Sequence, residues 1–461
     1  MLWEYIKSKM LKAPNTIMGE ENGIMTYEEV IIYAETYAKK LQGPCYAILC
    51  QSELMTAIAI LSCLAAGVTA VPISYKYGDI HCRKIFDSIK PPYAISDVDG
   101  ELKIIDIDLG EYHDDPEDRP ALIMCTSGTT GSPKGAMISE KNLLTNIKDI
   151  ESYFDIGNTD TILVARPLYH CAVLTGEFLT SLVKCTNIIF YSGKADPKKL
   201  INIIKSHQIT VMGGTPTLFQ MIERLNRGKS SLFSLKNIVV SGESLAGSVA
   251  VKIREIAPDA RIYHVYGLTE ASPRVLWLPP QDFEEYCEYS GLPLPSLEIK
   301  IIDENGTQLP ANIEGELCVR GNSIMKGYYN QPELTEKVIR DGWLHTGDIA
   351  YINEKGFVRI KGRKDNLIIK AGINIYPQEI ENTLKTDKRV EEVVAYGISD
   401  PFFGQKIGLE IKGAFSDKSE VIKLCHELLP TYEYPAVVEI VDEIPKNGSG
   451  KIIRKLRDYN G

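Results

Sequence analysis

The chain has 461 residues, a formal charge of −10 and 44% hydrophobic residues. This length predicts two to four domains or subdomains, and the hydrophobic content is sufficient for packed cores. A protein that binds a nucleic-acid backbone usually carries a basic patch or stripe, and the sequence has none, so nucleic acid is excluded as a main partner. The ten cysteines form no CxxC pair. We therefore expect reduced thiols and a cytoplasmic location.

Neither a targeting segment nor a membrane span is expected. The first fifteen residues include Glu4 and no apolar core, which is unlike a signal peptide. The longest apolar stretch, residues 56–73, is interrupted by Gly67 and Pro72. It is predicted to be a buried helix followed by a short strand at residues 68–73. A span would need about 20 more uniformly apolar residues.

In chain order, the first clear element is a helix. Thr26 and Glu29 form a capping box, and apolar residues follow at helical spacing to residue 41. Residues 46–49 are predicted to form a strand, and strand and helix signals alternate from there to about residue 270. Such alternation indicates α/β architecture with largely parallel strands.

The pattern changes near residue 297. Short β segments at residues 297–302, 316–320 and 348–360 predict a small antiparallel β subdomain. The residues after 364 carry helix and strand signals of their own. We therefore expect an α/β protein with two domains. The large N-terminal domain (residues 1–364) would contain layered α/β sheets and the small β subdomain, and a smaller C-terminal α/β domain would span residues 365–461.

The strongest local signal is the loop CTSGTTGSPKGA at residues 125–136, which follows an apolar strand. Its glycines let the backbone approach an anion, and its hydroxyls and N–H groups can bind phosphate oxygens. A Walker loop needs GxxxxGK followed by Ser or Thr, and here Gly135 follows the lysine, so that type is excluded. A flexible surface loop is the alternative. The residues predicted to bind phosphate are Thr126, Ser127, Gly128, Thr129, Thr130, Gly131 and Lys134.

This loop resembles the phosphate-binding signature of the adenylate-forming superfamily. That superfamily includes acyl- and aryl-CoA synthetases, nonribosomal peptide adenylation domains and beetle luciferases. Further motifs match in the same order, so the resemblance extends from about residue 26 to residue 454. It implies that ATP and a small carboxylic acid form an acyl-adenylate with Mg²⁺. The acyl group would then pass to the thiol of coenzyme A or of a phosphopantetheine arm.

The YGLTE segment at residues 266–270 resembles the second signature of the superfamily. Glu270 would supply the carboxylate oxygen that Mg²⁺ prefers. The resemblance places the Thr269 hydroxyl near the α-phosphate, and Tyr266, followed by Gly267, against the adenine. Taken alone, this pentapeptide would be interpreted as a helix-capping Thr-Glu pair with a buried tyrosine.

Two further motifs are assigned to the nucleoside part of ATP. The SGES segment at residues 241–244 lies where the superfamily has a small, glycine-rich stretch beside the adenine. Gly242 and Glu243 are therefore predicted to line the nucleotide pocket, with a simple strand-to-helix turn as the alternative. The WLHTGD motif resembles the ribose-binding motif. Its final Asp348 would accept hydrogen bonds from two hydroxyls, assisted by Arg363.

The PKNGSGKIIR segment at residues 445–454 resembles the C-terminal catalytic motif. The reaction joins two anionic groups, and a mobile ammonium that contacts both would stabilise the transition state. The resemblance assigns this role to Lys451, with a solvated basic tail as the alternative. Asp365 matches the hinge about which the C-terminal domain of the superfamily rotates. That rotation would bring the segment around Gly372 to a tunnel for the thiol.

The PLYH segment that ends at His170 resembles the start of the acid pocket in acyl- and aryl-CoA ligases. Amino-acid-activating members usually carry an Asp here, so His170 argues against an ordinary α-amino acid. His170 is a candidate catalytic residue, and a histidine that only packs in the pocket wall is the alternative. Two adjacent glycines would leave room for a flat ring. The predicted acid-pocket residues are Tyr169, His170, Gly213, Gly214 and Ala271.

No carrier domain is recognisable in the sequence, so the acceptor would come in trans. It would be coenzyme A or a separate acyl or peptidyl carrier protein. One alternative is a free-standing adenylation enzyme for an amino acid that feeds a nonribosomal peptide or polyketide pathway. Others are luciferase-type oxidation and a non-catalytic adenylate-binding protein. The last is disfavoured because Lys134, Glu270, Asp348 and Lys451 are all present.

Overall fold

The computed structural model describes residues 1–20, 23–75, 79–107, 110–127, 133–193, 196–226, 232 and 234–446, without the side chains of residues 79–81. The chain divides into two compact units. The first contains Met1–Leu245, Val249–Ile299 and Val319–Leu344, and the second contains Ala246–Ser248, Lys300–Cys318 and His345–Gly461. This division differs from the predicted domains, because part of the small β subdomain groups with the C-terminal residues. The predicted boundary at residues 364 and 365 stays a prediction.

A seven-stranded sheet of the first unit has the order β18-β8-β7-β4-β3-β5-β6. Strands β3, β4, β5 and β7 are parallel to one another, whereas β6, β8 and β18 are antiparallel additions at the edges. The strands are β3 (Cys45–Ile48), β4 (Thr69–Pro72), β5 (Tyr93–Val98), β6 (Glu101–Asp106), β7 (Leu122–Ser127), β8 (Pro133–Ile138) and β18 (Gly327–Tyr328). The helices that occur along this part of the chain are α1 (Leu2–Met10), α2 (Tyr27–Ala38), α3 (Glu53–Ala66) and α4 (Asp79–Ile89).

The second sheet of this unit has nine strands in the order β15-β14-β13-β12-β11-β9-β10-β1-β2. Strands β1, β10, β9, β11, β12 and β13 are parallel, and β2, β14 and β15 are antiparallel additions at the edges. The strands are β1 (Ile17–Glu20), β2 (Gly23–Thr26), β9 (Thr161–Val164), β10 (Asn187–Phe190), β11 (Val211–Gly214), β12 (Asn237–Val240), β13 (Arg261–Gly267), β14 (Arg274–Leu278) and β15 (Leu292–Pro293). The predicted α/β architecture with largely parallel strands is confirmed.

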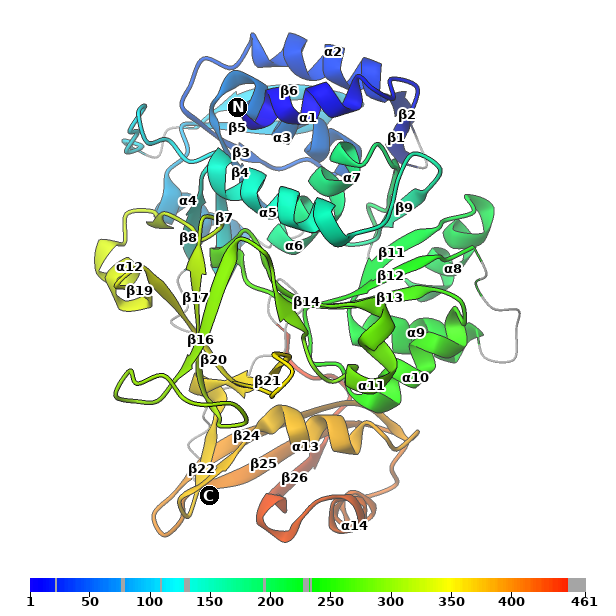
Figure 1. Cartoon of the computed structure of the whole chain (residues 1–461), viewed down its shortest axis with the longest axis vertical. Coiled ribbons are helices and arrows are strands. Elements are labelled where there is room, and N and C mark those ends of the chain that lie inside the picture. The colour runs from blue at the N-terminus through cyan, green and yellow to red at the C-terminus, as the bar shows by residue number, and fades with distance from the viewer. Residues whose placement is uncertain are drawn as a thin grey trace. The chain divides into compact units, whose positions relative to one another are not determined.

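Helices cover this second sheet, and Figure 1 shows α8, α9 and α10 beside β11, β12 and β13. A π-helix at Leu174–Leu179 continues α6 into α7. The helices of this part of the chain are α5 (Glu140–Tyr153), α6 (Cys171–Val173), α7 (Thr180–Val183), α8 (Pro197–Ser206), α9 (Pro216–Asn226), α10 (Gly247–Ile256), α11 (Phe283–Tyr286) and α12 (Pro332–Val338).

Local sequence signals explain several of these elements. The hydroxyl of Thr26 accepts a hydrogen bond from the N–H of Glu29, whose side chain accepts one from the N–H of Thr26, so the capping box is confirmed. The predicted buried helix is α3, whose residues are buried from Glu53 to Leu64. It ends at Gly67, where φ is +68°, a conformation that favours glycine. Among the helices of the described ranges, none combines the length and apolar character needed to cross a membrane.

Two smaller sheets complete the chain. One has the order β16-β17-β20-β19 with β21 paired to β20, and the division between the units passes through β16, β17 and β20. The other lies in the second unit, where β26 pairs with β25 and α13 and α14 lie beside the sheet (Figure 1). The strands are β16 (Leu297–Ile302), β17 (Gly315–Gly321), β19 (Ile339–Arg340), β20 (Trp343–Ile352), β21 (Val358–Arg363), β22 (Ile368–Lys370), β23 (Ile373–Ile375), β24 (Val390–Asp400), β25 (Gly404–Gly413) and β26 (Val437–Ile440), with α13 at Pro377–Leu384 and α14 at Lys418–Leu428.

Candidate active site

Most predicted site segments of the first unit lie at one edge of the nine-stranded sheet. Because β9, β11, β12 and β13 are parallel, their carboxyl ends share that edge. Ligands of open α/β sheets bind beside the carboxyl ends of the strands. The segments found at or directly after these ends are 167–170, 213–214, 242–243 and 266–270. The fold therefore gathers the predicted adenine, magnesium and acid positions, although their individual roles stay predictions.

The phosphate loop connects β7 and β8 of the seven-stranded sheet. In this antiparallel pair Thr126 lies directly opposite Lys134, and Ser127 lies opposite Pro133. The hairpin thus places a predicted phosphate-binding hydroxyl and the lysine at neighbouring positions. Residues 128–132 lie outside the described residues, and with them the predicted roles of Gly128, Thr129, Thr130 and Gly131.

A tyrosine that sequence reasoning missed connects this loop to the predicted magnesium ligand. The hydroxyl of Tyr328 donates a hydrogen bond to Oε1 of Glu270 at 2.7 Å. The ammonium of Lys134 lies 5.6 Å from the centroid of the same tyrosine ring. Tyr328 reaches this position because β18 pairs with β8, where it lies opposite Ala136. No motif in the sequence marks Tyr328, because its role depends on this strand pairing.

The loop after Glu270 is held by a buried asparagine of α5. The side-chain amide of Asn146 donates hydrogen bonds to the carbonyl oxygens of Arg274 at 2.8 Å and Ala271 at 3.5 Å. Its own carbonyl oxygen accepts one from the N–H of Arg274 at 3.3 Å. Gly267 allows the loop to fold back, because a Cβ there would overlap the carbonyl of Pro273. Asn146 is a second residue that sequence reasoning missed.

The predicted acid pocket differs from expectation at its two glycines. A Cβ at Gly213 would overlap the carboxylate of Glu177, and one at Gly214 would lie 2.9 Å from the ring of Phe219. The space beside both glycines is therefore filled by side chains of this chain. The expectation that these glycines leave room for a flat ring is therefore wrong, because Glu177 and Phe219 occupy the space beside them.

The neighbouring PLYH segment is anchored to α3. The carboxylate of Glu53, which is buried, accepts a hydrogen bond from the N–H of Leu168 at 3.0 Å. The rings of Tyr169 and His170 lie 4.3 Å apart, and His170 precedes the first residue of α6. This geometry places both rings at the sheet edge without deciding between a catalytic and a packing role for His170.

Two buried charged residues, Glu177 and Arg274, and the half-buried Arg166 also lie at this edge. Arg166 forms an ion pair with Glu177 and donates a hydrogen bond to the hydroxyl of Ser241 at 3.1 Å. The guanidinium of Arg274 donates to the hydroxyl of Tyr153 at 2.8 Å. Sequence reasoning missed all three charged residues. The signal in the sequence that could have identified them is that each is a charged residue within an otherwise apolar segment.

The segment predicted to line the adenine contains one constrained backbone position. Gly242 has φ of +89°, which favours glycine. Glu243 accepts hydrogen bonds from the N–H and the hydroxyl of Thr217 at 3.2 and 2.6 Å. Its carboxylate is therefore directed to the start of α9, which agrees with the alternative of a strand-to-helix turn. The predicted role of Tyr266, at the end of β13, is consistent with its half-buried position.

The predicted ribose residues lie together within the second unit. Asp348 on β20 is directly opposite Arg363 on β21, and their charged groups are 3.5 Å apart. The guanidinium also donates to the carbonyl of Thr346 at 2.9 Å. The hydroxyl of Thr346 in turn accepts a hydrogen bond from the N–H of Asp348 at 3.0 Å. The two residues that were predicted to act together on the ribose are thus neighbours in the fold, and their role in ribose binding stays a prediction.

The remaining predicted residues, Asp365, Gly372 and Lys451, belong to the second unit. Asp365 is exposed in a short 3-10 turn between β21 and β22, within the second unit, and its role as a hinge stays a prediction. Gly372, with φ of +80°, lies at the exposed tip of the β22–β23 hairpin. Lys451 lies outside the described residues, so its predicted catalytic role is not described by the structure.

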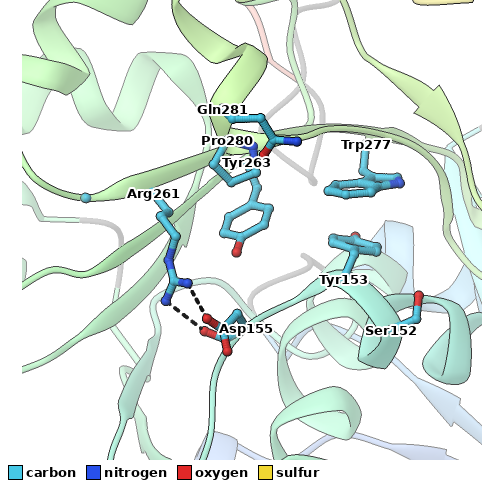
Figure 2. Close-up of a pocket in the computed structure, with 9 residues that line it drawn as sticks. Ser152, Tyr153, Asp155, Arg261, Tyr263, Trp277, Pro280 and Gln281 are labelled. Carbon is cyan, nitrogen blue, oxygen red and sulfur yellow. Dashed lines mark hydrogen bonds and ion pairs between the residues drawn. The ribbon is translucent and has the colours of Figure 1, made fainter.

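A surface pocket of 680 Å³ lies at the opposite edge of the nine-stranded sheet, near the start of β13. Figure 2 shows the facing rings of Tyr153 and Trp277, whose centroids are 4.1 Å apart, and the ion pair of Arg261 with Asp155. None of the residues predicted for the nucleotide or the acid lines this pocket. The predicted site at the carboxyl edge of the sheet is therefore distinct from this pocket.

Comparison with known families identifies two matching regions. Residues 9–329 match the model of the AMP-binding enzyme family, and residues 379–451 match that of the AMP-binding enzyme C-terminal domain. A feruloyl-CoA synthase from an Amycolatopsis species is 33% identical over 357 residues, which cover 75% of this chain and 72% of that protein. A long-chain-fatty-acid–CoA ligase from Escherichia coli O6:H1 is 32% identical over 349 residues, covering 74% of this chain and 62% of that protein.

Solved structures with the same fold cover almost the whole chain. The o-succinylbenzoate CoA synthetase MenE from Bacillus subtilis, in complex with its acyl-adenylate intermediate, has a TM-score of 0.85 and 25% identity over 98% of this chain and 96% of that chain. The same enzyme with ATP and a magnesium ion has a TM-score of 0.83, 25% identity and 98% coverage of both chains. ATP-bound MatB from Rhodopseudomonas palustris, at 23% identity, has a TM-score of 0.83 and covers 97% of this chain and 96% of that chain.

Proposed function

Because the chain belongs to the AMP-binding enzyme family, we propose that it is an AMP-forming acid–thiol ligase. In the first half-reaction, a carboxylate oxygen of the acid attacks the α-phosphorus of ATP, and pyrophosphate leaves. In the second, a thiol attacks the acyl carbon of the adenylate, and AMP leaves. The thiol proton is released to solvent.

The observation that carries this proposal is the contact of Tyr328 with both Glu270 and Lys134. The ring and hydroxyl of one side chain bring the predicted metal carboxylate close to the cation of the phosphate loop. A carboxylate for Mg²⁺ beside a lysine for phosphate is the arrangement that a nucleoside triphosphate requires. Lys134 would offset negative charge on the phosphate oxygens, and Tyr328 would hold Glu270 in position.

The donor set at Glu270 fits a magnesium ion. Among the described residues, the structure gives the Glu270 carboxylate a hydrogen bond at Oε1 alone, so Oε2 is available for a cation. Glu270 is half-buried, which leaves it accessible from the sheet edge. Mg²⁺, when bound, would neutralise charge on ATP as pyrophosphate forms.

In the second unit, the Asp348 carboxylate, which is largely buried and pairs with Arg363, would accept hydrogen bonds from the two ribose hydroxyls. Lys451 would contact both the acid and the α-phosphate in the first half-reaction. We also propose that rotation at Asp365 then replaces Lys451 with the segment around Gly372 for the second half-reaction.

We propose coenzyme A as the acceptor and an aryl or acyl carboxylic acid as the substrate. The names of the relatives, which are CoA synthases or ligases of aryl and fatty acids, support both. His170, in the place where an amino-acid-activating member would carry an Asp, supports an acid without an α-ammonium. A carrier protein is the alternative acceptor. The ten free cysteines support a reducing, cytoplasmic location.

The test is acid-dependent exchange of labelled pyrophosphate into ATP with Mg²⁺, across aryl, fatty, β-amino and α-amino acids. Exchange with one class is the expected result, followed by acid-dependent consumption of coenzyme A thiol. Exchange with α-amino acids alone would instead favour a free-standing adenylation enzyme. ATP binding without exchange for any acid would contradict the proposed ligase.

A further inference from the structure

Two buried asparagines lie on the same face of α5. Asn142 is 8% exposed and Asn146 is 0% exposed, and residues four apart in a helix are neighbours on its surface. A buried carboxamide needs hydrogen-bond partners, because leaving its polar groups unpaired costs free energy. Both side chains have partners in segments far from α5 in the sequence, Asn142 at residues 322–324 and Asn146 at residues 271–274.

The Asn142 carboxamide uses its whole hydrogen-bonding capacity. Its oxygen accepts from the N–H and the hydroxyl of Ser139 at 2.9 and 2.7 Å, which completes the capping box at the start of α5. Its nitrogen donates to the carbonyl oxygens of Asn322 at 2.7 Å and Ile324 at 2.8 Å. A carboxamide has two N–H donors and an oxygen with two lone pairs, so all four sites are occupied. The oxygen therefore stabilises the helix, and the nitrogen holds the distant segment.

The segment held by Asn142 leads directly to two contacts with Glu270. The N–H of Met325 donates a hydrogen bond to the backbone carbonyl oxygen of Glu270 at 2.8 Å. The hydroxyl of Tyr328 donates to the carboxylate of the same residue at 2.7 Å. Residues 325–328 thus hold both the backbone and the side chain of the predicted magnesium ligand. Asn142 contributes to its position by fixing the start of this segment.

Asn146 fixes the chain on the other side of Glu270. Its side chain accepts a hydrogen bond from the N–H of Arg274 at 3.3 Å and donates one to the carbonyl oxygen of the same residue at 2.8 Å. A longer contact of 3.5 Å reaches the carbonyl oxygen of Ala271, the residue directly after Glu270. The loop is therefore tied to α5 within four residues of the predicted magnesium ligand.

Helix α5 continues directly from the phosphate hairpin. Strand β8, which contains Lys134, ends at Ile138, and Ser139 is the N-cap of α5. The helix that holds both segments beside Glu270 is therefore joined to the strand with the predicted phosphate-binding lysine. All of these residues belong to the first unit. A magnesium ion bound to ATP needs its protein carboxylate at a fixed distance from the phosphates, and α5 connects the two positions.

We propose that Asn142 and Asn146 are positioning residues for magnesium, which hold Glu270 from both sides at the place where it binds the ion of Mg-ATP. This inference rests on the proposed ligase function. Mg²⁺ demands near-octahedral geometry, so a displaced carboxylate binds it poorly. Partners that orient a metal ligand typically contribute about 10- to 100-fold to metal affinity. Both asparagines act through Glu270 and contact neither the ion nor the nucleotide themselves.

The experiment measures binding of labelled ATP by equilibrium dialysis, once with saturating Mg²⁺ and once with EDTA in its place. The ratio of the Kd in EDTA to the Kd with Mg²⁺ reports the contribution of the ion and needs no acid substrate. Asn142→Asp keeps the acceptor for Ser139 and removes the donors to residues 322–324. Asn146→Ala removes the contacts to the loop. Each should lower the ratio about tenfold, or to one where the unaltered ratio is smaller, and leave the Kd in EDTA unchanged.

Asn237→Ala is the matched control. Asn237 is also 0% exposed, and its side chain contacts Asp155 and Arg261 at the opposite edge of the nine-stranded sheet. This variant should lower the free energy of unfolding in urea and leave the ratio of the two Kd values unchanged. An equal fall of the ratio in the control and in the α5 variants would show a general loss of stability and overturn the positioning role.

The outcomes separate this inference from the ligase proposal. A ratio above one that the folded α5 variants leave unchanged would overturn the inference alone. A ratio of one for the unaltered protein would overturn the proposed role of Glu270 and this inference with it, while pyrophosphate exchange tests the ligase function separately. If Asn146→Ala does not fold, Asn142→Asp, which keeps the cap of α5, decides the question.

Discussion

The hydroxyl of Tyr328 donates a hydrogen bond to the Glu270 carboxylate at 2.7 Å, across 58 residues of chain. The bond exists because β18 pairs with β8, the strand that follows the phosphate loop. Tyr328 thereby positions Glu270, which belongs to the second signature, beside the sheet that contains the phosphate loop. The catalytic importance of this contact can be tested directly.

Tyr328→Phe should weaken magnesium-dependent adenylation. The substitution removes a hydrogen bond to a charged group, which is typically worth about 1.5–3 kcal/mol, so kcat/KM in pyrophosphate exchange should fall about 10- to 100-fold. The magnesium concentration for half-maximal exchange should rise, because Glu270 loses its positioning partner. Tyr329→Phe is the matched control, since the hydroxyl of Tyr329 contacts the backbone of His113 instead. An unaltered magnesium titration for Tyr328→Phe would contradict the positioning role.

Lys451→Ala should separate the two half-reactions. It should abolish acid-dependent pyrophosphate exchange, because no other cation would bridge the carboxylate and the α-phosphate. Transfer to coenzyme A from a supplied acyl-adenylate should remain largely intact. Lys446→Ala is a control in the same segment, where the lysine pairs with Glu392 at 2.7 Å. Equal loss of both half-reactions in a folded Lys451→Ala protein would show that the assigned role is wrong.

Asp348→Ala should act mainly on ATP. Loss of hydrogen bonds from two ribose hydroxyls to a carboxylate should raise the KM for ATP about tenfold or more, with a smaller change in kcat. The acid KM should remain close to that of the unaltered protein. Asp387→Ala removes a half-buried aspartate that pairs with Arg389 in the same unit, and it should leave the KM for ATP unchanged. Equal KM values for ATP in both variants would remove Asp348 from the ribose site.

His264 should make stability depend on pH below neutrality. Burial lowers the pKa of His264 from 6.5 to about 4, even though its ring contacts the carbonyl oxygen of Tyr289 at 2.8 Å. Above pH 6.5 the ring is neutral in both states. Between pH 6.5 and about 4 the unfolded chain binds a proton that the folded chain does not. The free energy of unfolding should therefore fall through this window by about 3 kcal/mol from this group.

The measurement is urea unfolding at several pH values between 7 and 4.5. Because carboxylates titrate in the same range, the informative quantity is the difference in slope between the unaltered protein and His264→Gln. That variant should lose less stability on acidification. His207→Gln, at an exposed histidine, should follow the unaltered protein. Parallel slopes for all three proteins would contradict the role of His264.

Sequence patterns succeeded where the physical cause is local. The capping box at Thr26 needs only residues three apart, and the end of α3 needs only a glycine that accepts a positive φ. The alternation of strands and helices was sufficient for the parallel sheets. The motifs placed Asp348 near Arg363 because a short hairpin separates them.

By itself, then, the sequence determined the family, the α/β architecture and the order of the site segments, since these follow from periodicity, turns and contiguous motifs. Only the tertiary structure decided which side chains meet at the sheet edge. Tyr328 reaches Glu270 through a strand pairing, and Glu177 fills the space beside Gly213. The absence of a carboxylate partner for Arg274 among the described residues likewise follows from which segments pack around it. Such contacts depend on strand order and packing between segments far apart in the chain, which local patterns do not encode.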